Sequence, residues 1–147
     1  MKLGIAIIGD ISQEKANLIV NFSNNIKRKF NDKNYGSDVK SYTIGVVCIT
    51  PQFEQFFKVK RPKYTKGKKI INPDGIPFIL EDSLEYDVKL DFDTFNNASE
   101  LEAKKILAKE ILQSLKVLDD MKKKINDFDI IKFKTDLEDY FRNEGLV

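Results

Sequence analysis

The chain has 147 residues, of which 41% are hydrophobic and 33% are charged, and its formal net charge is +2. This length suffices for one domain, expected over residues 1–147, that buries roughly two thirds of the surface of the unfolded chain. One cysteine and no histidine are present, which excludes Ser-His-Asp and Cys-His catalysis and zinc sites with histidine ligands. No apolar run reaches the roughly 20 residues of a membrane span, and the start of the chain lacks a signal-peptide cleavage site. We therefore expect a cytoplasmic protein without membrane contacts.

The first elements predicted are a strand and a helix. Residues 2–9 form a short apolar run that indicates a strand. Asp10 is the expected cap of the following helix, with Gln13 placed to reach back to it, and the apolar spacing carries that helix to about Phe30. Gly36 is the expected left-handed stop after it.

A second strand and a hairpin are predicted next. Residues 39–50 are expected to form a strand whose part from Ile44 to Ile49 is apolar on both faces, which is typical of a central strand. Cys48 is interpreted as a small core residue. The turn Pro73-Asp74-Gly75 lies between residues 68–72 and 76–80, and its proline and glycine favour a hairpin there.

The stretch from Leu84 to Phe92 alternates apolar and charged residues without a fault. Its apolar members are Leu84, Tyr86, Val88, Leu90 and Phe92, and its charged members are Glu85, Asp87, Lys89 and Asp91. Such alternation predicts one antiparallel strand with a buried face and a mostly acidic solvent-facing side.

Two helices are predicted after this strand. Ser99 and Glu102 form a capping box that opens a helix to about Lys124. The last helix is expected to start at a cap, Asp127 or Asp129, and to end at Gly145. The predicted fold class is α+β, with a largely antiparallel sheet of about four or five strands packed against one long N-terminal helix and two C-terminal helices.

One short pattern suggests catalysis. Pro73-Asp74 followed by Asp87, Val88 and Lys89 matches the spacing of metal-dependent nucleases, in which two acids hold Mg²⁺ beside a lysine. Alternation along a strand places Asp87 and Lys89 on the same face. The turn preferences of Pro-Asp-Gly explain Asp74 equally well, so the pattern leaves both interpretations open.

The segment from Lys58 to Lys69 holds seven lysine or arginine residues and no acid. Together with Phe57 and Tyr64, these cations would suit phosphate binding and stacking on bases, but a solvated loop or edge strand guarded by lysines has the same composition. A net charge of +2 does not favour a dedicated nucleic-acid binder.

Acidic residues gather around the alternating strand. These are Glu81, Asp82, Glu85, Asp87, Asp91 and Asp93. Plain solvent exposure is one interpretation of them. The other is a docking surface, since an array of carboxylates on a rigid sheet steers a basic partner and fixes its orientation.

Four segments together resemble a known family. They are Lys33-Asn-Tyr-Gly36 before a hydrophobic strand, Tyr86 to Phe92, Leu101 to Leu118, and Phe128 to Ile131. Most of the chain resembles the immunity proteins of bacterial polymorphic toxin systems, in particular the family catalogued as immunity protein forty-four.

The resemblance implies a non-enzymatic cytoplasmic protein that binds and neutralises a cognate protein toxin, with no cofactor or metal. It transfers no site residues. Occlusion of the toxin's active site by the acidic residues is the mechanism that charge suggests. A nuclease-like enzyme using Asp74, Asp87 and Lys89, and a small interaction module unrelated to toxins, remain the alternatives.

Overall fold

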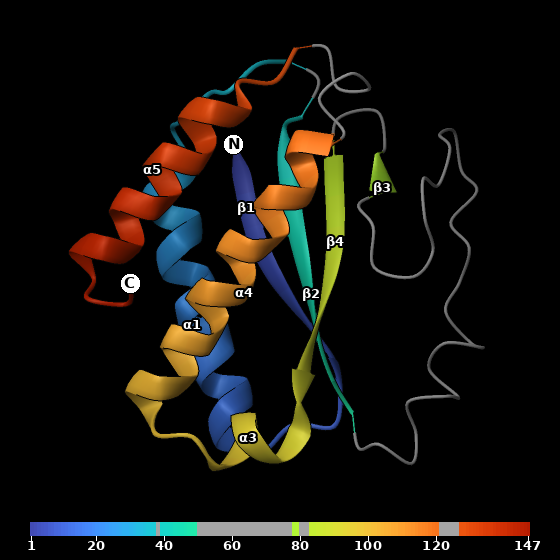
Figure 1. Cartoon of the computed structure of the whole chain (residues 1–147), viewed down its shortest axis with the longest axis vertical. Coiled ribbons are helices and arrows are strands. Elements are labelled where there is room, and N and C mark those ends of the chain that lie inside the picture. Colours follow the sequence, from blue (N-terminus) through green and yellow to red (C-terminus); the bar gives the residue numbers. More distant parts are fainter. Residues whose placement is uncertain (38, 50–77, 80–82, 121–126) are drawn as a thin grey trace.

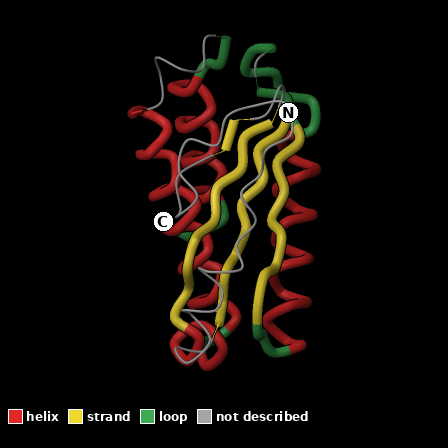
Figure 2. Tube along the Cα trace, turned by 90° about the vertical axis from the view of Figure 1, so that its right-hand side faces the viewer, coloured by secondary structure: helices red, strands yellow, loops and turns green. Residues whose placement is uncertain are grey.

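Three helices cover one face of a mixed sheet whose central strands run parallel (Figure 1). The computed structural model describes residues 1–37, 39–49, 78–79, 83–120 and 127–147. Its strands are β1 (Lys2–Gly9), β2 (Ser41–Ile49), β3 (Phe78–Ile79) and β4 (Ser83–Asp91). Its helices are α1 (Gln13–Phe30), α3 (Phe92–Asn97), α4 (Glu100–Asp120) and α5 (Ile130–Asn143). Figure 2 looks onto the face of the sheet opposite α1, α4 and α5.

The predicted antiparallel sheet is wrong. The strand order is β1-β2-β4-β3, and both long pairs, β1 with β2 and β2 with β4, are parallel. In the described part of the chain, antiparallel pairing is limited to the two residues of β3. A parallel pair needs a crossover connection, and α1 supplies one between β1 and β2 by packing along the sheet and returning the chain to its starting edge.

Several predicted features lie outside the described residues. They include the Pro73-Asp74-Gly75 turn, its first flanking strand and the basic segment from Lys58 to Lys69. From the second flanking strand, the structure describes Phe78 and Ile79 as β3.

The core lies between the sheet and the helices. Along β2, every second side chain points toward the helices and is fully buried: Tyr42, Ile44, Val46 and Cys48. The burial of Cys48 confirms its interpretation as a core residue. The predicted apolar stripe of α1 is confirmed as well, since Leu18, Ile19, Phe22, Ile26 and Phe30 are all buried. On β4, Val88 and Leu90 are buried as the alternation predicted.

Local side-chain bonds explain where the helices begin. The cap of α1 is Ser12, whose hydroxyl accepts from the Lys15 amide at 3.2 Å, so the predicted cap Asp10 is wrong. The predicted capping box is confirmed, with Ser99 and Glu102 bonding reciprocally at 3.2 and 3.3 Å. Of the two predicted caps for α5, Asp129 is the one observed.

Candidate functional site

A cluster of carboxylates lies at one edge of the sheet, where β1, β2 and β4 all end because they run parallel. Helices α1, α3 and α4 begin at this same end of the molecule, at the bottom of Figure 1. The chain has no lysine or arginine in residues 3–14 or 90–103, and these two stretches hold six carboxylates, all exposed. We call this set the acidic edge: Asp10, Glu14, Asp91, Asp93, Glu100 and Glu102.

Hydrogen bonds join the turn after β1 to α3, so that the acidic edge forms one surface. The Ser12 amide donates to Oδ1 of Asn96 at 2.8 Å. The Asn96 side chain in turn donates to the Phe92 carbonyl at 2.9 Å and contacts Sγ of Cys48 at 3.7 Å. Asn96 thus links α3 to the ends of β1 and β2. Ser12 and Asn96 are 84 residues apart in the sequence.

Asp91 is fixed in orientation and in charge. Its carboxylate accepts from the Thr94 hydroxyl at 2.7 Å and from the Thr94 amide at 2.9 Å, and so caps α3. The hydroxyl bond, followed by the amide bond, lowers the pKa of Asp91 below its usual value. This side chain therefore stays ionised at neutral pH and presents its charge with little freedom to reorient.

The acids at this edge also have a structural explanation. The first turn of a helix carries a partial positive charge that stabilises nearby carboxylates, and Glu14, Asp93, Glu100 and Glu102 all lie in first turns. Lys15 is buried in the first turn of α1 and pairs with Glu14 at 3.6 Å. These carboxylates therefore stabilise the starts of the helices, and their charge remains exposed on the surface, where a partner can meet it.

The structure divides the predicted acidic residues between two surfaces. Asp91 and Asp93 belong to the acidic edge, because β4 ends at Asp91 and α3 begins at Phe92. Asp87 is half-buried on the sheet face opposite the helices. Glu81 and Asp82 lie outside the described residues, as does the side chain of Glu85.

The nuclease pattern is only partly visible. Asp87 and Lys89 share the sheet face opposite the helices, as predicted, beside Gly45 and Val47 of β2. Asp74 lies outside the described residues. Within the part of the chain that the structure describes, no group of three or more acidic or cysteine side chains is arranged to hold a metal ion.

The thiol of Cys48 is adjacent to the acidic edge. Burial raises its pKa, and the nearby charges of Asp91 and Asp10 act in the same direction, outweighing the hydrogen bond from Asn96. The group therefore remains a protonated thiol at neutral pH, which agrees with a packing role.

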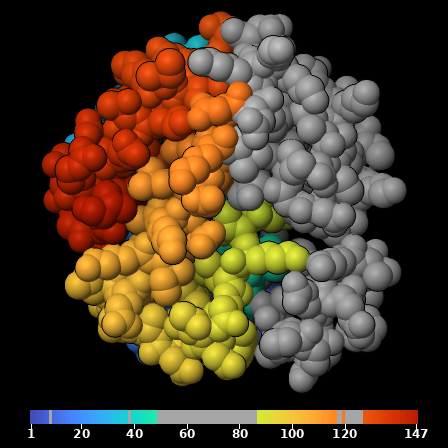
Figure 3. Space-filling view, in the orientation of Figure 1, coloured from blue at the N-terminus to red at the C-terminus, as the bar shows by residue number. Residues whose placement is uncertain are grey.

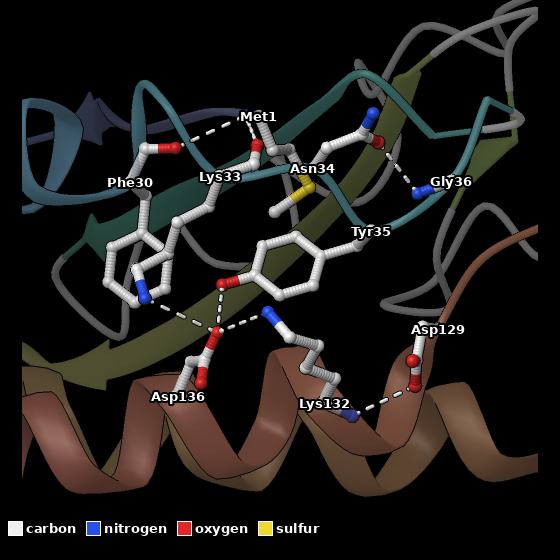
Figure 4. Close-up of polar contacts among 9 residues, drawn as sticks. All are labelled: Met1, Phe30, Lys33, Asn34, Tyr35, Gly36, Asp129, Lys132 and Asp136. Carbon is white, nitrogen blue, oxygen red and sulfur yellow. Dashed lines mark hydrogen bonds and ion pairs between the residues drawn. The ribbon is translucent and has the colours of Figure 1, made fainter.

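A second polar cluster joins α5 to the loop that follows α1. Figure 4 shows the Asp136 carboxylate of α5 between Tyr35, Lys33 and Lys132. Its Oδ2 accepts from the Tyr35 hydroxyl at 2.7 Å and from both lysine ammonium groups at 3.4 Å. The Tyr35 carbonyl also accepts from the Asp129 amide at 2.6 Å. This cluster holds the start of α5 against the sheet end opposite the acidic edge.

The cluster shifts the pKa values of the Asp136 carboxyl and the Tyr35 phenol in opposite directions. Burial alone would raise the pKa of Asp136, but the bonds from Tyr35 and Lys132 and the charges of Lys33 and Lys132 outweigh it and lower the pKa. The pKa of Tyr35 is raised, first by burial and then by its bond to Asp136. Both shifts favour a neutral phenol that donates to an ionised carboxylate.

Replacing Asp136 with asparagine should lower the free energy of unfolding by about 1–3 kcal/mol at pH 7, because Tyr35 and two ammonium groups lose a charged acceptor. The pKa of Asp136 is lower in the folded chain than in the unfolded one, so its contribution is present above about pH 4 and is lost as pH falls further. Urea denaturation of the wild type and the variant at pH 7 and pH 3 measures the loss of stability and its dependence on pH. Glu138→Gln, at an exposed site on the same helix, is the control.

Four members of the acidic edge were not predicted as site residues: Asp10, Glu14, Glu100 and Glu102. Asp10 and Glu14 lie far from β4 in the sequence and reach Asp91 and Asp93 because the strands are parallel. Glu100 and Glu102 lie there because α4 begins just after the short helix α3 that follows β4. The available signal was the strand-helix-strand order of residues 2–49, which is typical of a parallel pair.

Comparisons with known proteins give one match. A family model described as immunity protein 44 matches residues 1–143. No curated protein and no solved structure gives a significant match. Among the helices of the described residues, none is both long and apolar enough to cross a membrane.

Proposed function

Because the chain belongs to the immunity protein 44 family, we propose that it binds a cognate protein toxin and neutralises it without catalysing a reaction. The family match covers all but the last four residues and so includes every helix and strand described above. The chemistry of the toxin is inferred from the surface of this chain that would contact it.

The acidic edge is the surface that carries this proposal. It concentrates six exposed carboxylates on a chain whose overall charge is +2. Its backbone is held by the Ser12–Asn96 bond, and Asp91 is oriented by Thr94. A charged surface that is ordered before binding loses little entropy when a partner docks, so its charges act on the encounter and on the orientation of the complex.

A basic toxin cleft is the partner that this charge fits. Enzymes that act on polyanions such as nucleic acids line their active sites with lysine and arginine. The acidic edge would occupy such a cleft and exclude the substrate.

Reversing charge at Asp10 and Asp93 tests this proposal without removing a helix cap, since neither side chain caps a helix in the structure. The double variant Asp10→Lys/Asp93→Lys should bind the cognate toxin domain with an association rate about tenfold lower at low salt. Stopped-flow measurements should show that the difference shrinks in about 0.5 M salt, where charges are screened.

The matched control is Asp32→Lys/Glu138→Lys, which changes net charge equally at exposed sites away from the acidic edge. If both double variants slow association to the same extent, the acidic edge has no special role and only net charge matters.

A further inference from the structure

A small cavity opens between α1, α4 and α5, next to the acidic edge. Its volume is about 160 Å³, and it is lined by residues from all three helices and by Leu146 of the C-terminal tail. Glu100 belongs both to this cavity and to the acidic edge, so one partner could contact both. In Figure 3, the red surface of the C-terminal residues adjoins the yellow surface where α4 begins.

The lining combines an apolar floor with polar walls. Leu18, Phe22 and Leu146 are at most 9% exposed and form the apolar part, while Leu101 is 53% exposed. A partner that covers Leu101 would remove its apolar surface from water, which favours binding. The apolar surface would accept the hydrocarbon part of a side chain.

Amide groups and an aromatic ring make up much of the remaining wall. The amides are those of Asn21 and Asn25 on α1. The ring of Tyr140 is half-buried and held edge-on against Phe30, with the ring centroids 6.0 Å apart. It also packs on Phe141 at 5.5 Å. Tyr140 is therefore an aromatic wall that does not need to reorder when a ligand enters.

One carboxylate of the cavity lining makes no ion pair within the described residues. Glu100 pairs with Lys104 at 3.1 Å. Glu144 also lines the cavity and makes no ion pair within the described residues, and its charge is close enough to Tyr140 to raise the pKa of the phenol, after burial. Arg28 is also near enough to lower the pKa of Tyr140, and its guanidinium donates to Asn25 Oδ1 at 2.8 Å. Glu144 is thus the acid available to a partner's cation.

The size of the cavity restricts its occupant to one side chain. A protein cavity of about 150 Å³ takes up a single benzene-sized molecule. Arginine has an apolar stem for the leucine floor and a planar guanidinium that stacks on an aromatic ring and donates to carboxylates and amides. A purely apolar side chain would leave Glu144 facing a desolvated interface without a partner, which is costly.

We propose that this cavity receives an arginine side chain of the cognate toxin, with the guanidinium between Tyr140 and Glu144 and the stem on Leu18, Phe22 and Leu146. This inference rests on the proposed function and names the anchor residue of that complex. The acidic edge governs the rate of encounter, and the arginine determines the lifetime of the complex, because buried arginine and tyrosine contacts dominate binding energy at protein interfaces.

A titration with N-acetyl-arginine methylamide tests the chemistry of the cavity without the toxin. Saturable amide shifts in two-dimensional NMR spectra should map to Leu101, Tyr140 and Glu144. The citrulline analogue, which has the same shape without the charge, should bind at least fivefold more weakly. Glu144→Gln should remove that preference. Equal shifts with both compounds, or shifts elsewhere only, would overturn the proposal, as would cavity shifts that arise when the protein concentration alone is raised, because a second copy would then be the occupant.

A second measurement uses the cognate toxin domain. Tyr140→Leu/Glu144→Gln should raise the dissociation rate at least tenfold and leave the association rate within about twofold. If the toxin binds the wild type and the double variant equally, the arginine proposal fails while the proposed function stands. If the toxin does not bind the wild type at all, the proposed function and the arginine proposal both fail, whatever the citrulline comparison shows.

Discussion

Replacing Phe133 with alanine should lower the free energy of unfolding by about 3–5 kcal/mol, a large fraction of the stability of a domain of this size. The Phe133 ring is fully buried at the meeting point of α1, α5 and the sheet. Its centroid lies 5.1 Å from that of Tyr35, and rings of Phe30, Tyr42 and Phe128 lie within 6.2 Å. Removal leaves a cavity that four rigid rings cannot close, and urea denaturation followed by circular dichroism measures the cost.

The neighbouring Ile131 supplies the control. Its side chain is 65% exposed on the same helix, so Ile131→Ala should change stability by no more than about 0.5 kcal/mol. Similar losses for Phe133→Ala and Ile131→Ala would mean that α5 does not pack on the core as described.

Gly36→Ala should cost about 2–4 kcal/mol for two additive reasons. Gly36 has φ +123°, a conformation that residues with a Cβ rarely adopt. A Cβ at this position would also collide with the carbonyl group of Asp127. Because the colliding atoms are backbone, they cannot rotate away, and the loop after α1 would have to shift from its contact with the start of α5. The shift of the thermal midpoint measures this cost.

Gly145→Ala separates the two reasons. Gly145 has φ +74° and closes α5, with the Leu146 amide bonded to the Phe141 carbonyl at 2.9 Å. A Cβ added to Gly145 would meet no atom of the described residues within 4 Å. Its replacement should therefore cost only the backbone strain, about 1–2 kcal/mol. Equal effects at the two glycines would show that the contact with Asp127 is unimportant.

Local patterns in the sequence predicted local structure well. The periodic apolar residues of α1 and α5 are buried, and the Ser99–Glu102 capping box is present, because each depends on residues a few positions apart. Gly36 has the expected positive φ but does not terminate α1, which ends six residues earlier at Phe30. Asp10 and Ser12 can both cap a helix. The apolar spacing of the helix did not distinguish them, and Gln13 favoured Asp10.

Strand direction was missed, although the strand-helix-strand order of residues 2–49 is typical of a parallel pair, because the prediction relied on alternation within single strands. Alternation along β4 shows that one face of the strand is buried, and it is the same whether the neighbouring strand runs parallel or antiparallel. The acidic edge follows from the parallel direction, which brings Asp10 and Glu14 to the same end as Asp91 and Asp93. Residues 84–93 therefore indicated a charged surface without showing which other acids share it.

The most direct test of the proposed function is the growth of cells that express the proposed cognate toxin domain. With this protein co-expressed, growth should be restored, and the Asp10→Lys/Asp93→Lys variant should restore it less well at equal expression. Continued growth arrest in the presence of abundant, folded wild-type protein would contradict the proposal that the chain neutralises this toxin.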